Sequence, residues 1–215
     1  MPLQSDTVAL ARNALAVAKA AGVGHIVRSS GAGADCGLPI TIGRVQGEID
    51  QLVIESGIPY TITRPNCFMQ NCAGYYAVMI RSGALYLPQG DGKVSFIDVR
   101  DIAVVNAVLL RHPADHAGRI YELTGGEALS NAEVVAPIGA AWGLDVNCVP
   151  VTDDAAIASM RESGTDAWTI DTLMSLNRLI ASGYAAGVSP DVQTLLGRAP
   201  IAFARFVADY IESWR

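Results

Sequence analysis

The chain has 215 residues, of which 51% are hydrophobic and 17% are charged, and its formal net charge is −6. A chain of this length buries a sizeable core, either in one domain or in a domain with a small lobe. Its acidity and its lack of basic runs argue against a nucleic-acid partner, because phosphate binding requires clustered Lys and Arg. No run approaches the roughly 18 uncharged apolar residues of a spanning helix, so we expect no membrane insertion.

The cysteine pattern argues against a metal site. The four cysteines lack CxxC spacing, and they are Cys36, Cys67, Cys72 and Cys148. We therefore expect neither a zinc site nor a disulfide framework, and interpret them as small buried side chains in a reducing compartment. No basic segment followed by an apolar core opens the sequence, so no export signal is predicted and the expected location is the cytoplasm.

The first third of the chain predicts alternating helices and strands. A helix is expected from about residue 6 to Gly22, since apolar residues recur at helical spacing and the glycine supplies a stop. Residues 25–30 (HIVRSS) predict a buried strand, and the glycine-rich segment 31–37 after it predicts a flexible loop, because its spacing does not fit GxGxxG. An amphipathic helix over 42–57 and a strand over 60–64 complete one βαβ unit.

The remaining elements are less regular. Residues 68–80 are rich in aromatic residues and Met, and they predict a helical cover over a cleft. The apolar segments 85–87 and 94–96 flank Asp91-Gly92, which predicts a type I′ hairpin. After them the pattern predicts a helix from Asp98, a strand over 119–123 and a helix from a capping box at Ser130. A short strand over 146–151 is expected next, followed by two helices broken near Gly164. The chain is then predicted to end with a short helix that stops at Gly197 and an amphipathic helix over 203–214.

This order of elements predicts an α/β fold. We expect a mostly parallel sheet with strands near 25–30, 60–64 and 119–123 and with helices on its faces. A small α-rich substrate lobe, not independent of the rest, is expected over 125–215, after a partial dinucleotide-binding domain over 1–124. In such open sheets ligands bind at the carboxyl ends of the strands.

Four segments carry a family resemblance. In chain order they are HIVRSS, ESGIPYTITRPNCFMQN, PQGDGKVSFIDVRDIA and YELTGGEALSNAEV. Together they resemble the NmrA-like family of atypical short-chain dehydrogenases/reductases, and the match runs nearly end to end. The resemblance implies a Rossmann-like fold that binds NAD(P), with NADP as the expected cofactor. The family's opening strand and GxxGxxG turn have no counterpart here, so we expect a truncated sheet that lacks the N-terminal glycine-rich half.

The resemblance also implies where catalytic residues would lie. Reductases of this superfamily use a Tyr or His with a Lys four residues later, and Ile42 and Gln46 stand at these positions here. Some relatives have His at the second position. Neither residue relays a proton, so the reductive site is interpreted as degraded. Ser29 and Ser30 match the superfamily's catalytic serine, where a hydroxyl could polarise a carbonyl or could simply satisfy the backbone at a strand end.

Cofactor and substrate contacts follow from the same resemblance. The residues that match the family's RPxxFMxN loop at the nicotinamide end of the cleft are Pro65, Asn66, Cys67, Phe68 and Asn71. With Ser29 they are the predicted cofactor-binding residues, and the rigid Arg-Pro turn is expected to aim Asn66 into the cleft. A structural turn is the alternative. The residues predicted to line an apolar substrate pocket are Tyr75, Tyr76, Met79, Trp142 and Trp168, although each taken alone is better explained as core.

Two functions from different classes remain open. The first is NAD(P)H-dependent reduction of a small apolar carbonyl, quinone or dye. The second is a non-enzymatic redox sensor or regulatory protein, which fits the altered catalytic positions and the missing anion site. An exposed edge at the first strand would be a pairing site, so we predict a homodimer or a partner protein. A truncated ordinary reductase, and cofactor-free catalysis by Ser29, Asn66 or Tyr75, are further alternatives.

Overall fold

The computed structural model describes residues 6–37 and 40–215. At its centre, three parallel strands lie in the order β1-β2-β5 and span Ile26–Ser29, Tyr60–Pro65 and Arg119–Leu123. The α/β class and the mostly parallel sheet are therefore confirmed. The carboxyl ends of the strands lie along one edge of the sheet, which is where folds of this class bind ligands.

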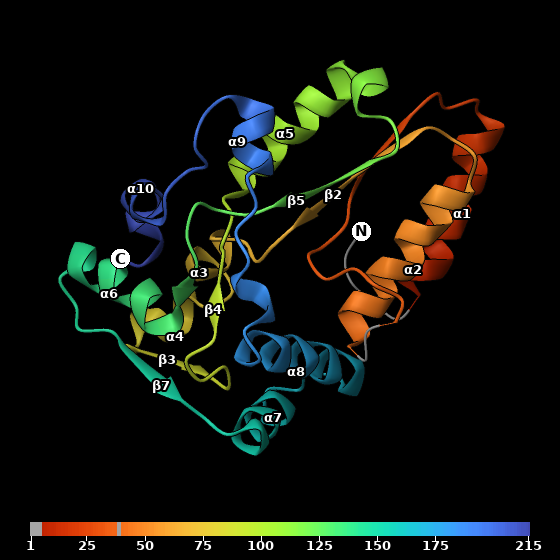
Figure 1. Cartoon of the computed structure of the whole chain (residues 1–215). Helices are drawn as coiled ribbons and strands as arrows, with labels where there is room; N and C mark the ends of the chain where they lie inside the picture. Colours follow the sequence, from red (N-terminus) through yellow and green to blue (C-terminus); the bar gives the residue numbers. More distant parts are fainter. Residues whose placement is uncertain (1–5, 38–39) are drawn as a thin grey trace.

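The helices of the described residues are α1 (Thr7–Ala20), α2 (Thr41–Glu55), α3 (Gln70–Ala73), α4 (Ala77–Arg81), α5 (Val99–Arg111), α6 (Asn131–Trp142), α7 (Asp153–Glu162), α8 (Ala167–Ala181), α9 (Asp191–Leu196) and α10 (Phe203–Asp209). Two layers cover the faces of the three-stranded sheet, α1 and α2 on one side and α5 and α9 on the other (Figure 1). On one face, Asp50 of α2 pairs with arginines of β1 and β2. On the other face, Asn106 of α5 accepts a hydrogen bond from Thr63. None of the helices in these described ranges is long and apolar enough to cross a membrane.

The glycine-rich segment 31–37 is packed against α2, whereas its composition predicts a flexible loop. The Asp35 amide donates to the Gly43 carbonyl at 3.1 Å. A Cβ on Gly47 would lie 2.6 Å from the Asp35 carbonyl carbon, and a Cβ on Gly43 would lie 2.7 Å from the Gly33 oxygen. The two glycines, one helical turn apart, therefore allow the backbone to cross α2 closely and fix one wall of the cleft.

The hairpin predicted around Asp91-Gly92 is wrong. β3 (Ala84–Leu87) pairs in parallel with β7 (Asn147–Pro150), and β4 (Lys93–Val94) pairs antiparallel with β6 (Leu129–Ser130). A type I′ turn requires positive φ at both central residues. No described non-glycine residue has positive φ, so Asp91 does not adopt that conformation. The chain turns instead at Gly90, and Gly92 lies against the backbone of Ile180.

Several local signals are confirmed. Ser130 and Glu133 form a complete capping box at the start of α6, and the Asp98 carboxylate caps α5 by accepting from the Arg100 amide. The helical segment near Gly164 is broken between α7 and α8, as expected. The last amphipathic segment is shorter than predicted, because α10 is followed by a 3-10 turn rather than by continued helix.

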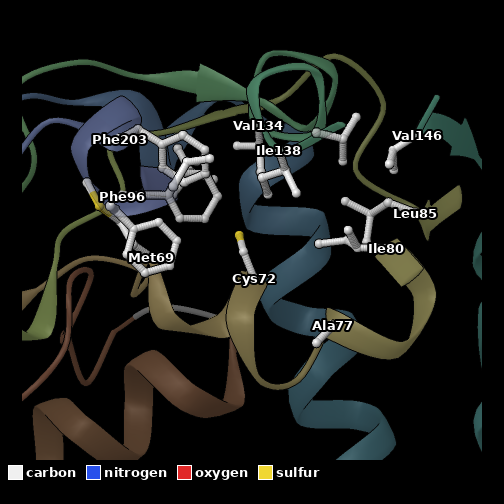
Figure 2. Packing of buried hydrophobic residues seen from close by; sticks show 14 of the residues in the cluster. Met69, Cys72, Ala77, Ile80, Leu85, Phe96, Val134, Ile138, Val146 and Phe203 are labelled. Atoms are coloured by element: carbon white, nitrogen blue, oxygen red, sulfur yellow. The ribbon is translucent and has the colours of Figure 1, made fainter. Parts of the chain in front are cut away.

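The larger hydrophobic core lies in the lobe, outside the three-stranded sheet. Figure 2 shows side chains that meet there from α3, α4, β3, α6, α10 and the segments that flank the helices and strands; they include Met69, Cys72, Ala77, Ile80, Leu85, Phe96, Val134, Ile138, Val146 and Phe203. A second, smaller cluster lies under α5 and α9. Segments before and after residue 125 contribute to both clusters, so the lobe shares its core with the earlier part of the chain.

Candidate functional site

A cavity of about 430 Å³ opens at the carboxyl ends of the sheet. We name it the strand-end cavity, and its lining residues are Ala32, Gly33, Ala34, Asp35, Arg64, Asn66, Glu122, Thr124, Leu176, Leu179, Tyr184, Ala185, Gly187, Val188 and Ser189. Its walls therefore come from the loop after β1, the ends of β2 and β5, α8 and the segment after α8. Both its size and its location are those of ligand sites in open α/β folds.

A chain of alternating charges lies under this cavity. Asp50 of α2 is only 2% exposed, and its carboxylate accepts from Arg28 Nε at 2.7 Å and from Arg64 Nε at 3.1 Å. Arg64 Nη1 lies 3.6 Å from Glu122 Oε1 on the neighbouring strand. Charges buried in this way are stable only when they are paired and hydrogen-bonded, so the network fixes the three strand ends relative to α2.

Gln46, at the predicted lysine position, holds an arginine. Its Oε1 accepts from Arg28 Nη2 at 2.5 Å, and the same nitrogen lies 3.5 Å from Ser30 Oγ. The positive charge near this position thus comes from β1 instead of α2. The structure brings two predicted catalytic residues, Ser30 and Gln46, together on one guanidinium group. Ser29, the third, is exposed at the end of β1.

Asn66 is a buried link between segments. Its Nδ2 donates to Ser95 Oγ and to the Ala185 carbonyl, both at 2.8 Å, and its Oδ1 accepts from the Cys67 amide at 2.8 Å. Asn66 lines the strand-end cavity, but its carboxamide is committed to protein partners. Of the two interpretations of this loop from the sequence, the structural turn describes the Asn66 side chain better.

The other residues of the predicted cofactor loop are dispersed. Pro65 is buried at the end of β2, Phe68 is exposed, and Asn71 is partly buried in α3. Cys67 packs against the larger core, where burial raises the pKa of its thiol to about 11. Of the five loop residues only Asn66 lines the strand-end cavity, and direct cofactor contact by the others stays a prediction.

A second cavity, of about 510 Å³, lies in the lobe. We name it the lobe pocket, and it is lined by Tyr75, Tyr76, Met79, Tyr86, Leu87, Pro88, Val151, Ala155, Ala156, Ser159, Met160, Ser163, Leu173, Leu176 and Asn177. Three of the five residues predicted for a substrate pocket, Tyr75, Tyr76 and Met79, line it. Trp142 instead packs against the larger core, and Trp168 lies in the first turn of α8 without lining either cavity.

The tyrosines give the lobe pocket an aromatic wall with neutral hydroxyl donors. The rings of Tyr75 and Tyr76 meet edge to face, with centroids 5.0 Å apart. Burial raises the pKa of the Tyr76 phenol well above its ordinary value, which keeps the hydroxyl protonated. Aromatic pairs of this geometry are rigid and present both apolar area and a polar tip to a ligand.

Sequence reasoning missed the charged and aromatic residues of the strand-end cavity. Arg64 and Glu122 become neighbours only through the register of β2 and β5. Partial burial raises the pKa of the Glu122 carboxyl, although Arg64 opposes the shift. Tyr184, in the turn after α8, packs its ring over Gly33, where a Cβ would lie 3.2 Å from Tyr184 Cε1. No local pattern marks these contacts, because each joins segments far apart in the chain.

Comparison with known proteins agrees with the resemblance seen in the sequence. The model of the NmrA-like family matches residues 3–167. An NAD(P)H azoreductase from Xenophilus azovorans is 40% identical over 205 residues, which are 95% of this chain and 71% of that protein.

Solved structures show the same fold. The NADPH-dependent quinone oxidoreductase of Escherichia coli, crystallised with NADPH, has a TM-score of 0.87 and 24% identity, covering 97% of this chain and 73% of that one. NmrA, a negative transcriptional regulator in complex with NAD, has a TM-score of 0.75 and 15% identity, covering 97% of this chain and 71% of that one. The likeness at these identities concerns the Rossmann-like fold alone. By its family match and its azoreductase relative, the chain belongs to the NmrA-like family.

Proposed function

We propose that this protein is an NAD(P)H-dependent oxidoreductase that reduces a small, uncharged aromatic carbonyl, quinone or dye. The observation that carries the proposal is the adjacency of the two cavities. Leu176 of α8 lines both, so an apolar chamber adjoins a polar cavity at the carboxyl ends of a parallel sheet. The 40% identical relative is an NAD(P)H azoreductase, which supports the same class of reaction.

The strand-end cavity is the proposed location of the nicotinamide half of NADP, which supplies the hydride when bound. Its volume and its mixed polar and apolar walls fit a ring and a ribose. Ser29, Ser30 and the loop from Pro65 to Asn71 border the same strand ends and are the proposed cofactor contacts. Asn66 acts by holding this loop to the segment after α8.

Ser30 is the proposed carbonyl-polarising group. Because Arg28 Nη2 lies within 3.5 Å of Ser30 Oγ and can only donate, the serine oxygen is the acceptor in that contact. The serine proton then remains available for a substrate oxygen, which carries developing negative charge as hydride arrives. Gln46 is a positioning residue in this scheme, since its Oε1 fixes the same guanidinium nitrogen.

Calorimetric titration with NADPH and NADH, followed by a turnover assay with a quinone, tests the proposal. We expect micromolar binding of one cofactor and quinone-dependent oxidation of it. No heat at millimolar cofactor would remove redox chemistry, and the non-enzymatic sensor or regulator, acting through a partner, would take its place.

We also propose that a second copy or a partner protein covers the outer edge of β1. Within residues 6–37 and 40–215, β1 pairs only with β2, and its other backbone edge has no strand beside it. Unpaired edges of this kind are pairing sites. Sedimentation velocity is expected to show a dimer, and a monodisperse monomer would count against the proposal.

A further inference from the structure

Three buried amides form a chain that ends at the lobe pocket. Asn131, at the start of α6, donates from Nδ2 to Gln89 Oε1 at 2.9 Å. Gln89 then donates from Nε2 to Asn177 Oδ1 at 2.7 Å. The three residues are 5%, 3% and 9% exposed. Since each amide orients the next, the carboxamide of Asn177 is held in one orientation.

Asn177 keeps donor capacity at this end of the chain. Its Nδ2 carries two N–H groups, and the partner it has among the described residues is Met174 Sδ, at 4.0 Å. Sulfur accepts hydrogen bonds weakly. A buried amide donor without a good acceptor costs free energy, so native structures seldom keep one without a reason. Asn177 lines the lobe pocket, and an acceptor on a bound molecule would satisfy it.

The rest of the lobe pocket limits what that molecule can be. Besides Asn177, its lining contains tyrosines, methionines, aliphatic side chains and two serines, Ser159 and Ser163, and no Asp, Glu, Lys, Arg or His. An ion entering it would lose hydration without gaining a counter-charge, which is expensive. Aromatic and thioether groups instead favour flat aromatic ligands. The strand-end cavity differs, because Arg64 and Glu122 line it.

We propose that Asn177 is the specificity-determining donor of the lobe pocket, which takes an uncharged planar molecule, a quinone or an aromatic ring, that bears a carbonyl or comparable acceptor. The hydroxyl of Tyr76, which also lines this pocket, is a second neutral donor, held protonated by burial. This inference deepens the proposed function, on which it rests for the identity of the ligand as substrate. Leu176, the residue before Asn177, faces both cavities, so an acceptor bound at Asn177 lies next to the proposed nicotinamide site.

Equilibrium dialysis without cofactor tests this assignment with three probes of one ring size. They are duroquinone, its hydrocarbon counterpart durene, and tetramethylbenzoate. The wild-type protein is expected to bind duroquinone roughly tenfold more tightly than durene, which is the worth of one satisfied hydrogen bond in a buried site. Tetramethylbenzoate is expected to bind more weakly than either. Equal affinity for duroquinone and durene in the wild type would overturn the proposal without any variant.

Two variants examine the donor itself. Asn177→Leu removes the carboxamide, and it is expected to bind duroquinone and durene equally. Asn177→Asp keeps an acceptor for Gln89 Nε2 but replaces the amide donor by a carboxylate oxygen, so its affinity for duroquinone is expected to fall. This variant tests the donor even if Asn177→Leu folds poorly. Asn106→Leu is the control, because it also removes a side-chain hydrogen bond, the partly buried one from Thr63, but lies on α5 and lines neither cavity. A retained duroquinone preference in Asn177→Leu would refute the role of Asn177.

Turnover separates this inference from the proposed function. If the wild type oxidises NADPH with duroquinone while Asn177→Leu keeps the ligand preference, the oxidoreductase stands and the Asn177 assignment fails. If binding depends on Asn177 but no cofactor is oxidised, the pocket assignment stands and the oxidoreductase fails.

Discussion

Asp50 is the residue on which the strand ends depend. It is buried on α2 and takes hydrogen bonds from two arginines of neighbouring strands, Arg28 and Arg64. Among the described residues, the other carboxylate within 4.0 Å of these arginines is that of Glu122, whose side chain is 46% exposed. Replacing such a carboxylate leaves cations partly buried beside a neutral group. The resulting loss of folding stability is therefore larger than the stabilisation that any single ion pair contributes.

Asp50→Asn is expected to lower the free energy of unfolding by about 3–5 kcal/mol, measured by urea denaturation. The control is Glu48→Gln on the same helix, because Glu48 pairs with Arg12 in an exposed contact of 3.2 Å. Exposed pairs are worth at most about 1 kcal/mol. Similar losses in the two variants would contradict the role assigned to Asp50.

His25 gives the fold a dependence on pH. Thr61 donates its hydroxyl proton to the His116 carbonyl at 2.8 Å, so the contact of 3.0 Å between Thr61 Oγ1 and His25 Nε2 requires the histidine to donate. Burial, and to a lesser degree His116, lowers the pKa of His25. The unfolded chain then takes up the proton first as pH falls, so stability decreases below about pH 6.5.

We expect the unfolding free energy of the wild type to fall between about pH 7.5 and about pH 5.5, with part of the slope due to His25. His25→Gln keeps an N–H donor for Thr61 but does not titrate, so its slope should be shallower. His112→Gln, at the exposed end of α5, should retain the wild-type slope. An unchanged slope in His25→Gln would show that other groups cause the pH dependence.

At the scale of the element, the loop that crosses α2 requires glycine at two positions of that helix, Gly43 and Gly47. Gly→Ala inside a helix ordinarily stabilises by about 1 kcal/mol. At Gly47 the added Cβ would lie 2.6 Å from the backbone of Asp35 and Cys36, which cannot rotate away. Gly47→Ala is therefore expected to destabilise the protein by about 1–3 kcal/mol in thermal unfolding. Gly24→Ala, where nothing lies within 4 Å, should have little effect, and a stabilising Gly47→Ala would disprove the close crossing.

The helix α8 acts as the partition between the two cavities. Leu176 lines both, whereas Leu173 lines the lobe pocket alone. Leu176→Ala should join the chambers and tighten the binding of phenanthrenequinone by roughly tenfold, since each buried CH₂-sized group adds about 0.8 kcal/mol. The affinity for the smaller duroquinone should change little. Leu173→Ala widens one chamber only, so an equal gain in both variants, measured by dialysis, would argue against a partition at Leu176.

The sequence predicted elements whose signals are local. The capping box at Ser130, the N-cap at Asp98 and the parallel strands follow from short patterns, and all are present. The hairpin around Asp91-Gly92 failed because β3 pairs with a strand some way along the chain, and no turn motif reports such a partner. The same limit applies to the site. Tyr75 and Tyr76 could be predicted as pocket residues from an aromatic-rich segment, whereas only the fold places Asn177 in the same pocket.

At the scale of the whole molecule, the two cavities divide the chemistry of the proposed reaction. The strand-end cavity carries charged groups at the carboxyl ends of the sheet, and the lobe pocket carries neutral and aromatic groups beyond α8. In the proposed reaction, an apolar substrate in the lobe pocket would be shielded from ionic side chains, while the nicotinamide half of the cofactor would have polar partners in the strand-end cavity. The lobe core that supports this division (Figure 2) is the larger of the two hydrophobic clusters among the described residues.

The link made by Asn66 has a consequence for redesign. Its amide joins the end of β2 to the carbonyl of Ala185, just beyond α8, and Ser95 donates to Gly187 of the same segment at 2.6 Å. The loop proposed to contact the cofactor is therefore hydrogen-bonded to the segment that follows α8, the helix between the two cavities. If the proposed function holds, we expect a substitution on α8 that widens the range of substrates to change the affinity for the cofactor as well, so the two properties would have to be redesigned together.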